Sequence, residues 1–377
     1  MRRATVYDVA ERAGVSTATV SFAFRRPEKV KPATREKVLE AARQLAYVPS
    51  ASARGLARGR TGALGLYSFD MILESPQGAD AQNAVEKLVM QEKPFGEKGE
   101  SMDDLIVSSS PDVLTYPLYV DEVQRGFELE CWHRGRMLLL GTAAKHDDEA
   151  RITDIAGRVD GLAVFPNKYT DALPWKALCK SVPIVRISER DMGNPAAYLS
   201  CDDASGMKLL VDHLIDVHGI HDMRFIGGLT NYDVRQRFET LRAHLAERGF
   251  ESPRVPFIEA DEIDGSFLGA LRVLVEEGLP GALVCGNDQM AYSVINALSD
   301  LGVRVPDDVA VTGFDGVIAG QVLSPRLTTV RQPMEEMGRL AACLLDEREG
   351  VPWDRPVEYV LPVALVVRES CGCEPTR

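Results

Sequence analysis

Apolar residues at helical spacing predict three short helices within the first 48 residues. Thr5 and Asp8 form a capping-box start for the first helix, and Gly14 ends it. Ser16 is a strong N-cap for the second helix, and Pro32 occupies a favoured first position of the third. A short turn through glycine between two short helices is typical of a helix-turn-helix. Residues 1–48 are therefore expected to form an all-α helix-turn-helix head.

The second helix of such a motif enters the major groove of DNA, with its first residues against base edges. Val20 and Phe24 are expected to face inward, which leaves small polar side chains on the outward face. Phe22 shares that face and cannot donate a hydrogen bond. It either packs against the neighbouring chain or contacts a thymine methyl group or the groove wall. The candidate DNA contacts are Ser16, Thr17, Ala18, Thr19, Ser21, Phe22 and Arg25.

Beyond residue 61 the pattern changes to short apolar runs that alternate with longer helical stretches. This alternation predicts parallel sheets in an α/β fold, which bind ligands at the carboxyl ends of their strands. The clearest helices are expected at 203–219, 233–249 and 288–302. Strands are expected at 62–69, 136–142, 161–166, 183–188, 223–228, 281–288 and 309–315.

Polar residues at two strand ends, and one basic residue on a helix, indicate a binding site. Asn287 and Asp288 follow one strand, Asp315 ends another, and Arg237 lies on the helix after a third. These groups would meet at the sheet edge where ligands bind. A local interpretation stays open, in which Asn287 or Asp288 caps the next helix and Arg237 forms a surface salt bridge.

Charge is distributed unevenly along the chain. Residues 1–60 hold 13 Lys/Arg against 5 Asp/Glu, a net charge of +8, within a chain of net charge −13. A basic head on an acidic body indicates a polyanion as the partner of the head.

The cysteines and histidines do not indicate a metal site. The seven cysteines are scattered apart from Cys371 and Cys373, which have no C-x-x-C partner. His213, His218 and His221 are interpreted as a surface helix end. We expect reduced thiols, no metal and no cofactor. With no apolar run of about 18 residues and no secretory signal, we expect a cytoplasmic protein without a membrane partner.

The stretches TVYDVAERAGVSTATVS and VKPATREKVLEAARQLAYVPSASARGLARGRTGALGL closely resemble the head of the LacI/GalR family of bacterial transcriptional repressors. The stretches VCGNDQMAYSVINALSDLGVRVPDDVAVTGFDG and SPRLTTVRQPMEEMG resemble the second lobe of that family's core. The resemblance implies an α/β two-lobed, periplasmic-binding-protein-like core. It also implies a homodimer on a near-palindromic operator in double-stranded DNA, associated with the bacterial nucleoid. A small-molecule effector, a sugar or related metabolite, would bind between the lobes.

The resemblance also assigns roles to residues. Leu56 would wedge into the central base step from a hinge helix that forms on DNA, and Phe22 departs from the polar residue that relatives often carry. Arg237 would clamp hydroxyls or a carboxylate, and Ser188 stands where relatives often have an acidic ligand contact. Further DNA contacts would be Thr5, Tyr7, Thr34, Tyr47, Ser50, Ala53 and Arg54, and further effector contacts would be Asn287, Asp315 and Phe165.

The expected domain order follows from these assignments. The head at 1–48 and a hinge at 49–61 precede a first lobe at 62–200 plus 330–350 and a second lobe at 201–329 plus 351–372. The chain would cross between lobes near Ser200, Thr329 and Gly350, and the second lobe would bind effector and dimerise. Residues 74–117 form an unusual insertion in the first lobe.

Two other classes of protein share parts of this pattern. A solute-binding receptor has the same two-lobed body, but the basic head and the missing export signal argue against it. A Rossmann enzyme is not favoured because no G-x-G-x-x-G follows a strand and no catalytic triad stands out. We therefore expect a regulator without catalytic activity.

Overall fold

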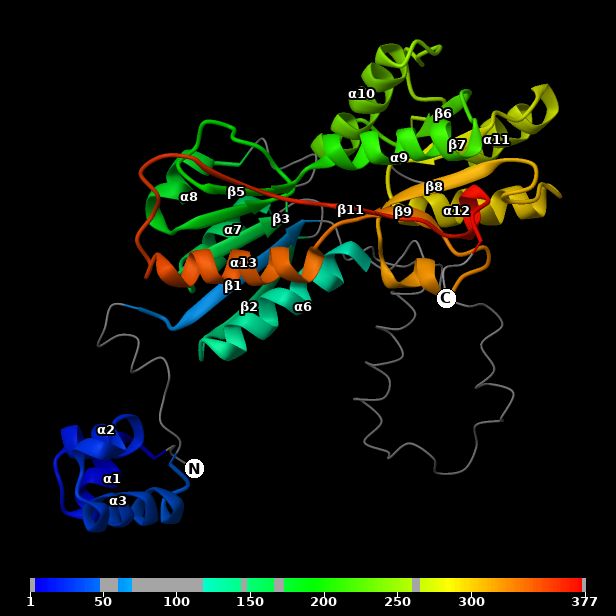
Figure 1. The fold of residues 1–377 in the computed structure, drawn as a ribbon. Coiled ribbons are helices and arrows are strands. Elements are labelled where there is room, and N and C mark those ends of the chain that lie inside the picture. Colours follow the sequence, from blue (N-terminus) through cyan, green and yellow to red (C-terminus); the bar gives the residue numbers. More distant parts are fainter. Residues whose placement is uncertain are drawn as a thin grey trace, which may run out of the picture. The chain divides into compact units, whose positions relative to one another are not determined.

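The computed structural model of the chain describes residues 4–47, 60–69, 118–143, 148–165, 173–259 and 265–374. The chain divides into two compact units, Met1–Gly62 and Ala63–Arg377. The first is an all-α head and the second is a two-lobed α/β core, as the sequence predicts (Figure 1). The insertion at 74–117 and most of the expected hinge lie outside the described residues. Among the described helices, none has the length and apolar composition needed to cross a bilayer.

The helices of the head begin and end where local side chains fix them. Thr5 and Asp8 form the expected capping box, and Gly14 adopts a left-handed φ of 64° at the end of the first helix. Ser16 Oγ accepts a hydrogen bond from the backbone N–H of Thr19 at 3.1 Å. These predicted boundaries are therefore confirmed. The elements are α1 (Val6–Ala13), α2 (Thr17–Arg25), the 3-10 turn η1 (Pro27–Lys29) and α3 (Pro32–Gln44).

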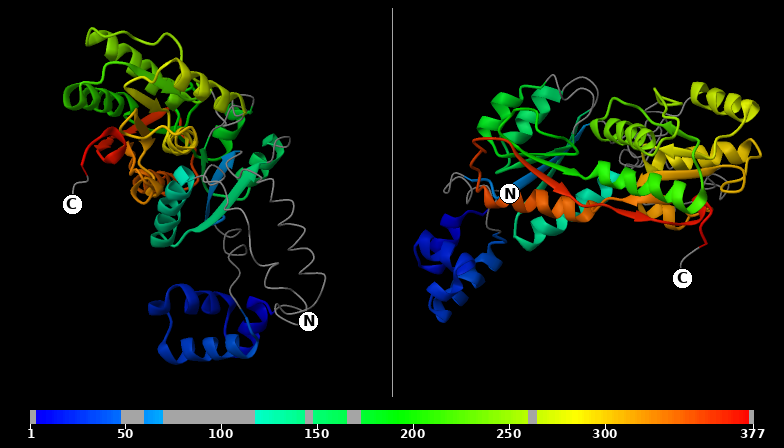
Figure 2. Two further views of the ribbon diagram at one scale, coloured as in Figure 1. Left: turned by 90° about the vertical axis from the view of Figure 1, so that its right-hand side faces the viewer. Right: turned by 45° about the horizontal axis from the view of Figure 1, so that its top comes forward.

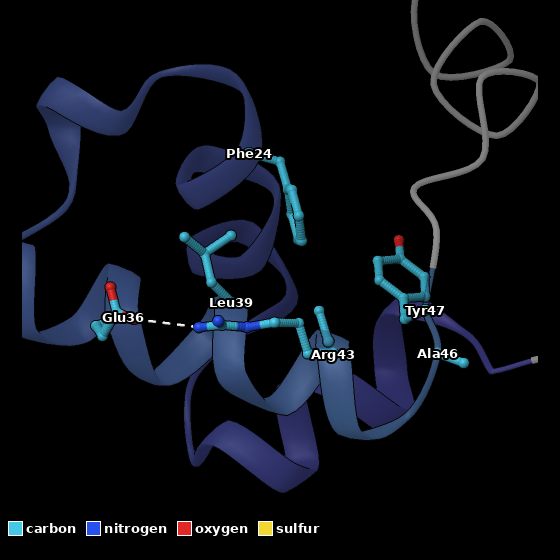
Figure 3. Close-up of a pocket in the computed structure, with 7 residues that line it drawn as sticks. Phe24, Glu36, Leu39, Arg43, Ala46 and Tyr47 are labelled. Carbon is cyan, nitrogen blue, oxygen red and sulfur yellow. Dashed lines mark hydrogen bonds and ion pairs between the residues drawn. The ribbon is translucent and has the colours of Figure 1, made fainter.

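The head has a small core of valine and alanine. Val9, Val20 and Val38 are fully buried at the meeting point of the three helices. Phe24 packs against this core from its edge, and its ring centroid lies 6.1 Å from that of Tyr47. Figure 3 shows these two rings beside a hollow that lies between the end of α2 and helix α3. So few buried methyl groups make the head a unit of modest stability.

The first lobe is built on a six-stranded parallel sheet in the order β10-β5-β4-β3-β1-β2. Successive residues of each strand point to opposite faces of the sheet, and each face has its own hydrophobic core. Leu64 and Leu66 pack with α6 and α13 on one face, whereas Tyr67 packs with α7 and α8 on the other. The strands are β1 (Ala63–Phe69), β2 (Met137–Ala143), β3 (Leu162–Phe165), β4 (Ile184–Ile187), β5 (Ala197–Cys201) and β10 (Val357–Leu361). The helices are α6 (Leu118–His133), α7 (Asp148–Ala156), α8 (Trp175–Ser181) and α13 (Met334–Glu347).

Helices α6 and α13 lie side by side in backbone contact (Figure 1). A Cβ atom on Gly126 would lie 1.9 Å from the carbonyl oxygen of Glu335, and one on Gly338 would lie 1.9 Å from that of Val123. Only glycine at these two positions permits this approach. The contact fixes α6, which carries side chains from the first lobe toward the second.

The second lobe contains a five-stranded sheet in the order β11-β9-β8-β7-β6, in which only β11 is antiparallel to its neighbour. Helices α9 and α10 pack on one face, and α11 and α12 pack on the other. The strands are β6 (Met223–Ile226), β7 (Ala282–Cys285), β8 (Ala310–Asp315), β9 (Thr328–Arg331) and β11 (Ala364–Val366). The other elements are α9 (Asp203–His218), α10 (Tyr232–Glu247), α11 (Gly265–Glu277), α12 (Asp288–Asp300), η5 (Ile318–Gln321) and η6 (Glu369–Cys371).

The chain passes between the lobes after β5, after β9 and after β10. The first two passages lie near the predicted positions, but the predicted third passage near Gly350 is wrong. Residues 357–361 form β10, which pairs in parallel with β5 of the first lobe, so the passage lies between Leu361 and Ala364. Gly350 instead adopts a left-handed φ of 82° just beyond α13. The C-terminal segment then runs from the first lobe to the second (Figures 1 and 2).

Candidate functional site

The outward face of α2 is the candidate DNA-reading surface of the head. Ala18 is exposed and Phe22 is 43% exposed, on the side of the helix opposite the fully buried Val20. Thr17 and Ser21 are half-buried beside them. The Phe22 ring therefore keeps much of its surface open, as a contact with a groove wall or a thymine methyl group requires.

The other residues predicted to contact DNA take different places. Tyr7 on α1 is 73% exposed, which gives the head a second accessible ring. Thr5 caps α1, while Thr34 and Tyr47 are half-buried on and after α3. Arg25 is the last residue of α2, and the side chains of Arg26, Lys29 and Lys31 after it are exposed. Ser50, Ala53, Arg54 and Leu56 lie outside the described residues.

Arg237 on α10 is the centre of a buried charged cluster at the strand ends of the second lobe. Its Nε donates to Asp203 Oδ1 at 2.8 Å, and its Nη1 donates to the carbonyl oxygen of Gly286 at 2.8 Å. The guanidinium also lies 3.8 Å from the centroid of the Phe314 ring. Arg237 is 3% exposed, so the alternative of a surface salt bridge is wrong.

Three aspartates surround this guanidinium. Asp315 Oδ1 lies 3.5 Å from Arg237 Nη1 and accepts a hydrogen bond from Gln332 Nε2 at 2.7 Å. Burial raises the pKa of Asp315 to about 6, against the opposing effect of Arg237. Burial also raises the pKa of Asp203, and burial together with the Asp203 charge raises that of Asp233 well above its ordinary value. The cluster holds more acidic groups than one guanidinium can neutralise.

The first lobe reaches this cluster through a chain of hydroxyl groups. Tyr119 on α6 places its hydroxyl 2.8 Å from Ser188 Oγ, and the Ser188 hydroxyl lowers the pKa of Asp233 of the second lobe, against the larger effect of burial. Ser188 follows β4 with a left-handed φ of 60°, which turns its side chain at the sheet edge. Contact between the lobes therefore runs through the candidate site itself.

Two further contacts join the lobes beside this chain of hydroxyls. Arg331 on β9 pairs with Glu122 on α6, and Arg190 lies 5.0 Å from the centroid of the Tyr232 ring. The pairing raises the pKa of Arg331. Each contact has one partner in each lobe, so a change in lobe separation would break both.

The structure brings together three of the five residues predicted to bind the effector. Arg237, Asp315 and Ser188 belong to the cluster. Asn287 caps α12, with its Oδ1 accepting from the backbone N–H of Met290 at 2.8 Å, which supports the local interpretation for that residue. Phe165 is buried, and its ring meets the Tyr119 ring edge-on at a centroid distance of 6.2 Å. Sequence reasoning missed Tyr119, Asp203, Asp233 and Gln332.

A second cluster brings two histidines and two cysteines together. His213 and His218 lie beside Cys371 and Cys373, with the four ligand atoms within 4.8 Å of one another. The sequence offers the cysteine pair no C-x-x-C partner, but α9 supplies two histidines from a distant part of the chain. His221 stays apart and stacks on Phe250 at a centroid distance of 4.3 Å.

A helix-turn-helix head joined to a two-lobed core with a polar cluster between the lobes defines a transcription regulator of the ligand-responsive class. Residues 5–50 match the family model of bacterial regulatory proteins, lacI family, and residues 211–371 match a periplasmic binding protein-like domain. The chain belongs to the LacI family and is a DNA-binding transcriptional repressor that responds to a small-molecule effector.

Two relatives match along nearly their whole length. The HTH-type transcriptional repressor PurR of Haemophilus influenzae (strain PittEE) is 30% identical over 379 residues, covering 97% of this chain and 98% of the relative. The ribose operon repressor of Escherichia coli (strain K12) is 30% identical over 377 residues, covering 97% of this chain and 99% of the relative. Both are repressors rather than enzymes by their names.

Solved structures share the fold. The Lac repressor dimer bound to operator and the anti-inducer ONPF has a TM-score of 0.74 at 23% identity, covering 98% of this chain and 99% of that one. The complex of the transcriptional regulator CelR with cellobiose has a TM-score of 0.62 at 26% identity, covering 98% of this chain and all of that one. The order of head and two lobes is therefore the same in all three chains.

Proposed function

We propose that two copies of this chain bind a near-palindromic operator in the bacterial cytoplasm, at the nucleoid, and that a neutral, hydroxyl-rich metabolite binds the Arg237 cluster. The α2 face with Ala18 and Phe22 reads the base edges, and the exposed Lys29 and Lys31 contact phosphates. No catalytic step is assigned to the cleft, in keeping with the repressor names of the relatives.

One observation carries the effector proposal. The Oδ1 atom of Asp233 is buried and has no hydrogen-bond partner among the described residues. A buried acceptor without a partner costs about 1–3 kcal/mol, so a ligand that donates a hydrogen bond there gains affinity. A sugar hydroxyl supplies that donor and stabilises the ionised form of the carboxylate.

The charge of the cluster selects against anions. Asp203, Asp233 and Asp315 surround the single guanidinium of Arg237, which already hydrogen bonds through Nε and Nη1. An added phosphate or carboxylate would face these three acidic groups in a poorly solvated space. A neutral carbohydrate brings no charge against these groups, and its hydroxyls can pair with the aspartate oxygens and with the hydroxyls of Tyr119 and Ser188. The ribose or cellobiose of the relatives' names fits this class.

The effector changes DNA binding through the contact between the two lobes. Ser188 and Asp233 belong to opposite lobes and their side chains interact, so a ligand that inserts between them or bridges them changes the preferred lobe separation. A ligand shifts such an equilibrium by its difference in affinity for the two arrangements. In a dimer, that separation sets the distance between the two heads on the operator.

Operator binding measured with and without candidate effectors tests the proposal. A neutral sugar should change operator affinity by about 5- to 150-fold, the usual range of allosteric coupling. Asp233→Asn should remove most of this response while leaving operator affinity without effector within about twofold. Asp307→Asn, which alters an exposed aspartate of the same lobe, is the matched control and should respond like the wild type. A response to sugar phosphates but not to neutral sugars would contradict the proposed ligand class.

A further inference from the structure

Two histidines of α9 and two cysteines of the C-terminal segment converge in the second lobe, away from the Arg237 cluster. His213 Nε2 lies 3.3 Å from His218 Nε2, 3.6 Å from Cys371 Sγ and 3.6 Å from Cys373 Sγ. Cys373 Sγ lies 3.2 Å from His218 Nε2. All four ligand atoms fall within 4.8 Å of one another, and this is the one such group in the part of the chain that the structure describes.

Three of these separations match edges of a zinc tetrahedron, and the fourth, between Cys373 Sγ and His218 Nε2, is shorter at 3.2 Å. Bond lengths of about 2.0–2.1 Å to nitrogen and 2.3 Å to sulfur place two nitrogens about 3.3 Å apart and a nitrogen and a sulfur about 3.6 Å apart. The observed nitrogen–nitrogen distance of 3.3 Å and two nitrogen–sulfur distances of 3.6 Å agree with these edges. We propose that His213, His218, Cys371 and Cys373 bind one Zn²⁺ ion.

The donor set suits zinc in particular. Two thiolates and two neutral imidazoles form the Cys2His2 set of structural zinc sites, and the two thiolate charges neutralise the ion. Four protein ligands leave no open position for water or substrate, so the site is structural rather than catalytic. His213, His218 and Cys373 are half-buried, which leaves the ion a path from solvent.

Rigid elements hold the two cysteines in place. Ser370 Oγ accepts from the backbone N–H of Thr328 at 2.9 Å and donates to the Val311 carbonyl oxygen at 2.5 Å, which ties the segment to β8 and β9. Glu369, the residue before Ser370, also pairs with Arg326, with 3.0 Å between Arg326 Nη2 and Glu369 Oε1. Gly372 has a left-handed φ of 98°, which lets the chain turn between the two sulfurs.

Residues other than the four proposed ligands also support the cluster. The hydroxyl of Thr328 lies 3.1 Å from Cys371 Sγ, where its proton can stabilise a thiolate. His218 ends α9, and Gly219 caps that helix with a left-handed φ of 65°. The ion would therefore fasten the last residues of the chain to α9, beside the segment that returns from the first lobe. Its removal should loosen the second lobe without altering the DNA-reading face.

Metal content of the full chain tests this proposal directly. The protein is purified without a polyhistidine tag and under reducing conditions, and zinc is measured by mass spectrometry after dialysis. We expect one Zn²⁺ per chain, release of the ion by a chelator with a fall of several degrees in melting temperature, and recovery on adding zinc. Substitution of Co²⁺ should give the visible absorption of a tetrahedral thiolate site.

Matched variants separate this site from incidental binding. Cys373→Ser and His218→Ala should lose the stoichiometric ion, while circular dichroism shows that they stay folded. Cys343→Ser removes a half-buried cysteine outside the cluster, and His221→Ala removes the neighbouring histidine that stacks on Phe250; both should keep one ion per chain. Failure of the reduced wild type to take up stoichiometric zinc or cobalt would overturn the proposal. So would equal zinc content in Cys373→Ser, or a Cys371–Cys373 disulfide that persists in reductant.

Discussion

The head and the Arg237 cluster are built from different kinds of residue. Every described part of the DNA-reading head lies within residues 4–47, and its core consists of valine and alanine. The cluster is assembled from chain segments as distant as Tyr119 and Gln332, and its centre is a buried arginine among aspartates. Local signals such as caps and helical spacing therefore specify the head, whereas the cluster exists only after both lobes have folded.

The two regions also differ in whether the residues that recognise a partner contribute to the stability of the fold. In the head, the residues that would recognise DNA are exposed and contribute little to folding, as for Phe22 at 43% exposure. In the cluster, the residues that would recognise the effector are themselves buried and charged. Altering them must therefore change the stability of the core as well as its ligand response.

The largest expected effect follows from removing the central cation. Arg237→Leu leaves Asp203 and Asp315 buried without their guanidinium and should cost about 3–5 kcal/mol in the free energy of unfolding. Arg235→Leu on the same helix is the control, because Arg235 is exposed and its guanidinium donates to the carbonyl oxygen of Leu229 rather than to a buried carboxylate. Denaturant unfolding measures both. An equal loss in the two variants would remove the distinction between a buried cluster and an exposed helix face.

A second effect concerns pH. Because burial raises the pKa of Asp315 to about 6, the folded state keeps a proton that the unfolded chain releases near its ordinary value of 3.8. The stability contributed by this group is present below about pH 4 and is lost as the pH rises through about 6. Relative to wild type, Asp315→Asn should therefore gain on the order of 3 kcal/mol between pH 4 and pH 7. Paired unfolding curves across that range check the sign; a constant difference would contradict it.

The same difference between the head and the Arg237 cluster decides which features can be predicted from the sequence. Capping box, glycine turn and helix starts in the head are set within a few residues, so the sequence predicts them. Asp203 and Asp233 lie in the first turns of α9 and α10, where acidic residues are common for local reasons, and nothing local marks them as partners of Arg237. Cys371 and His213 are 158 residues apart, so their meeting depends on the fold alone.

The lobe boundaries show a related limit. Residues 357–361 alternate between half-buried and exposed positions and lie between Pro356 and Pro362, which is a recognisable pattern for an edge strand. Which sheet the strand joins is a matter of tertiary pairing, and β10 joins β5 of the first lobe. For this reason the sequence pattern alone places the third passage between the lobes too early in the chain.

A smaller effect should appear at Phe22. Phe22→Ala should leave the fold intact, because the ring lies outside the buried core of the head. It should change the preference at one base pair of each half-site by about 1–3 kcal/mol and leave non-specific binding unchanged. Competition among operator variants measures this. An equal loss on specific and random duplexes would show that the ring does not read a base.

The smallest effect is expected at the start of α2. Ser16→Ala should cost about 1 kcal/mol of head stability, because the cap on the Thr19 N–H is lost. Ser16→Asp keeps a capping oxygen but adds a negative charge beside the DNA, so the helix should persist while affinity falls on all sequences. Hydrogen exchange of the α2 amides and DNA titrations distinguish these outcomes. Weaker α2 protection in Ser16→Asp than in Ser16→Ala would contradict the assignment.

The central claim is that a symmetric pair of heads binds DNA under the control of an effector-responsive core. Selection of bound sequences from random duplexes tests this claim most directly. The full chain should enrich a near-palindrome of two inverted half-sites, and a neutral sugar that binds the core should alter its retention. Enrichment of no sequence by folded protein at low salt, or of a single half-site without symmetry, would contradict the account.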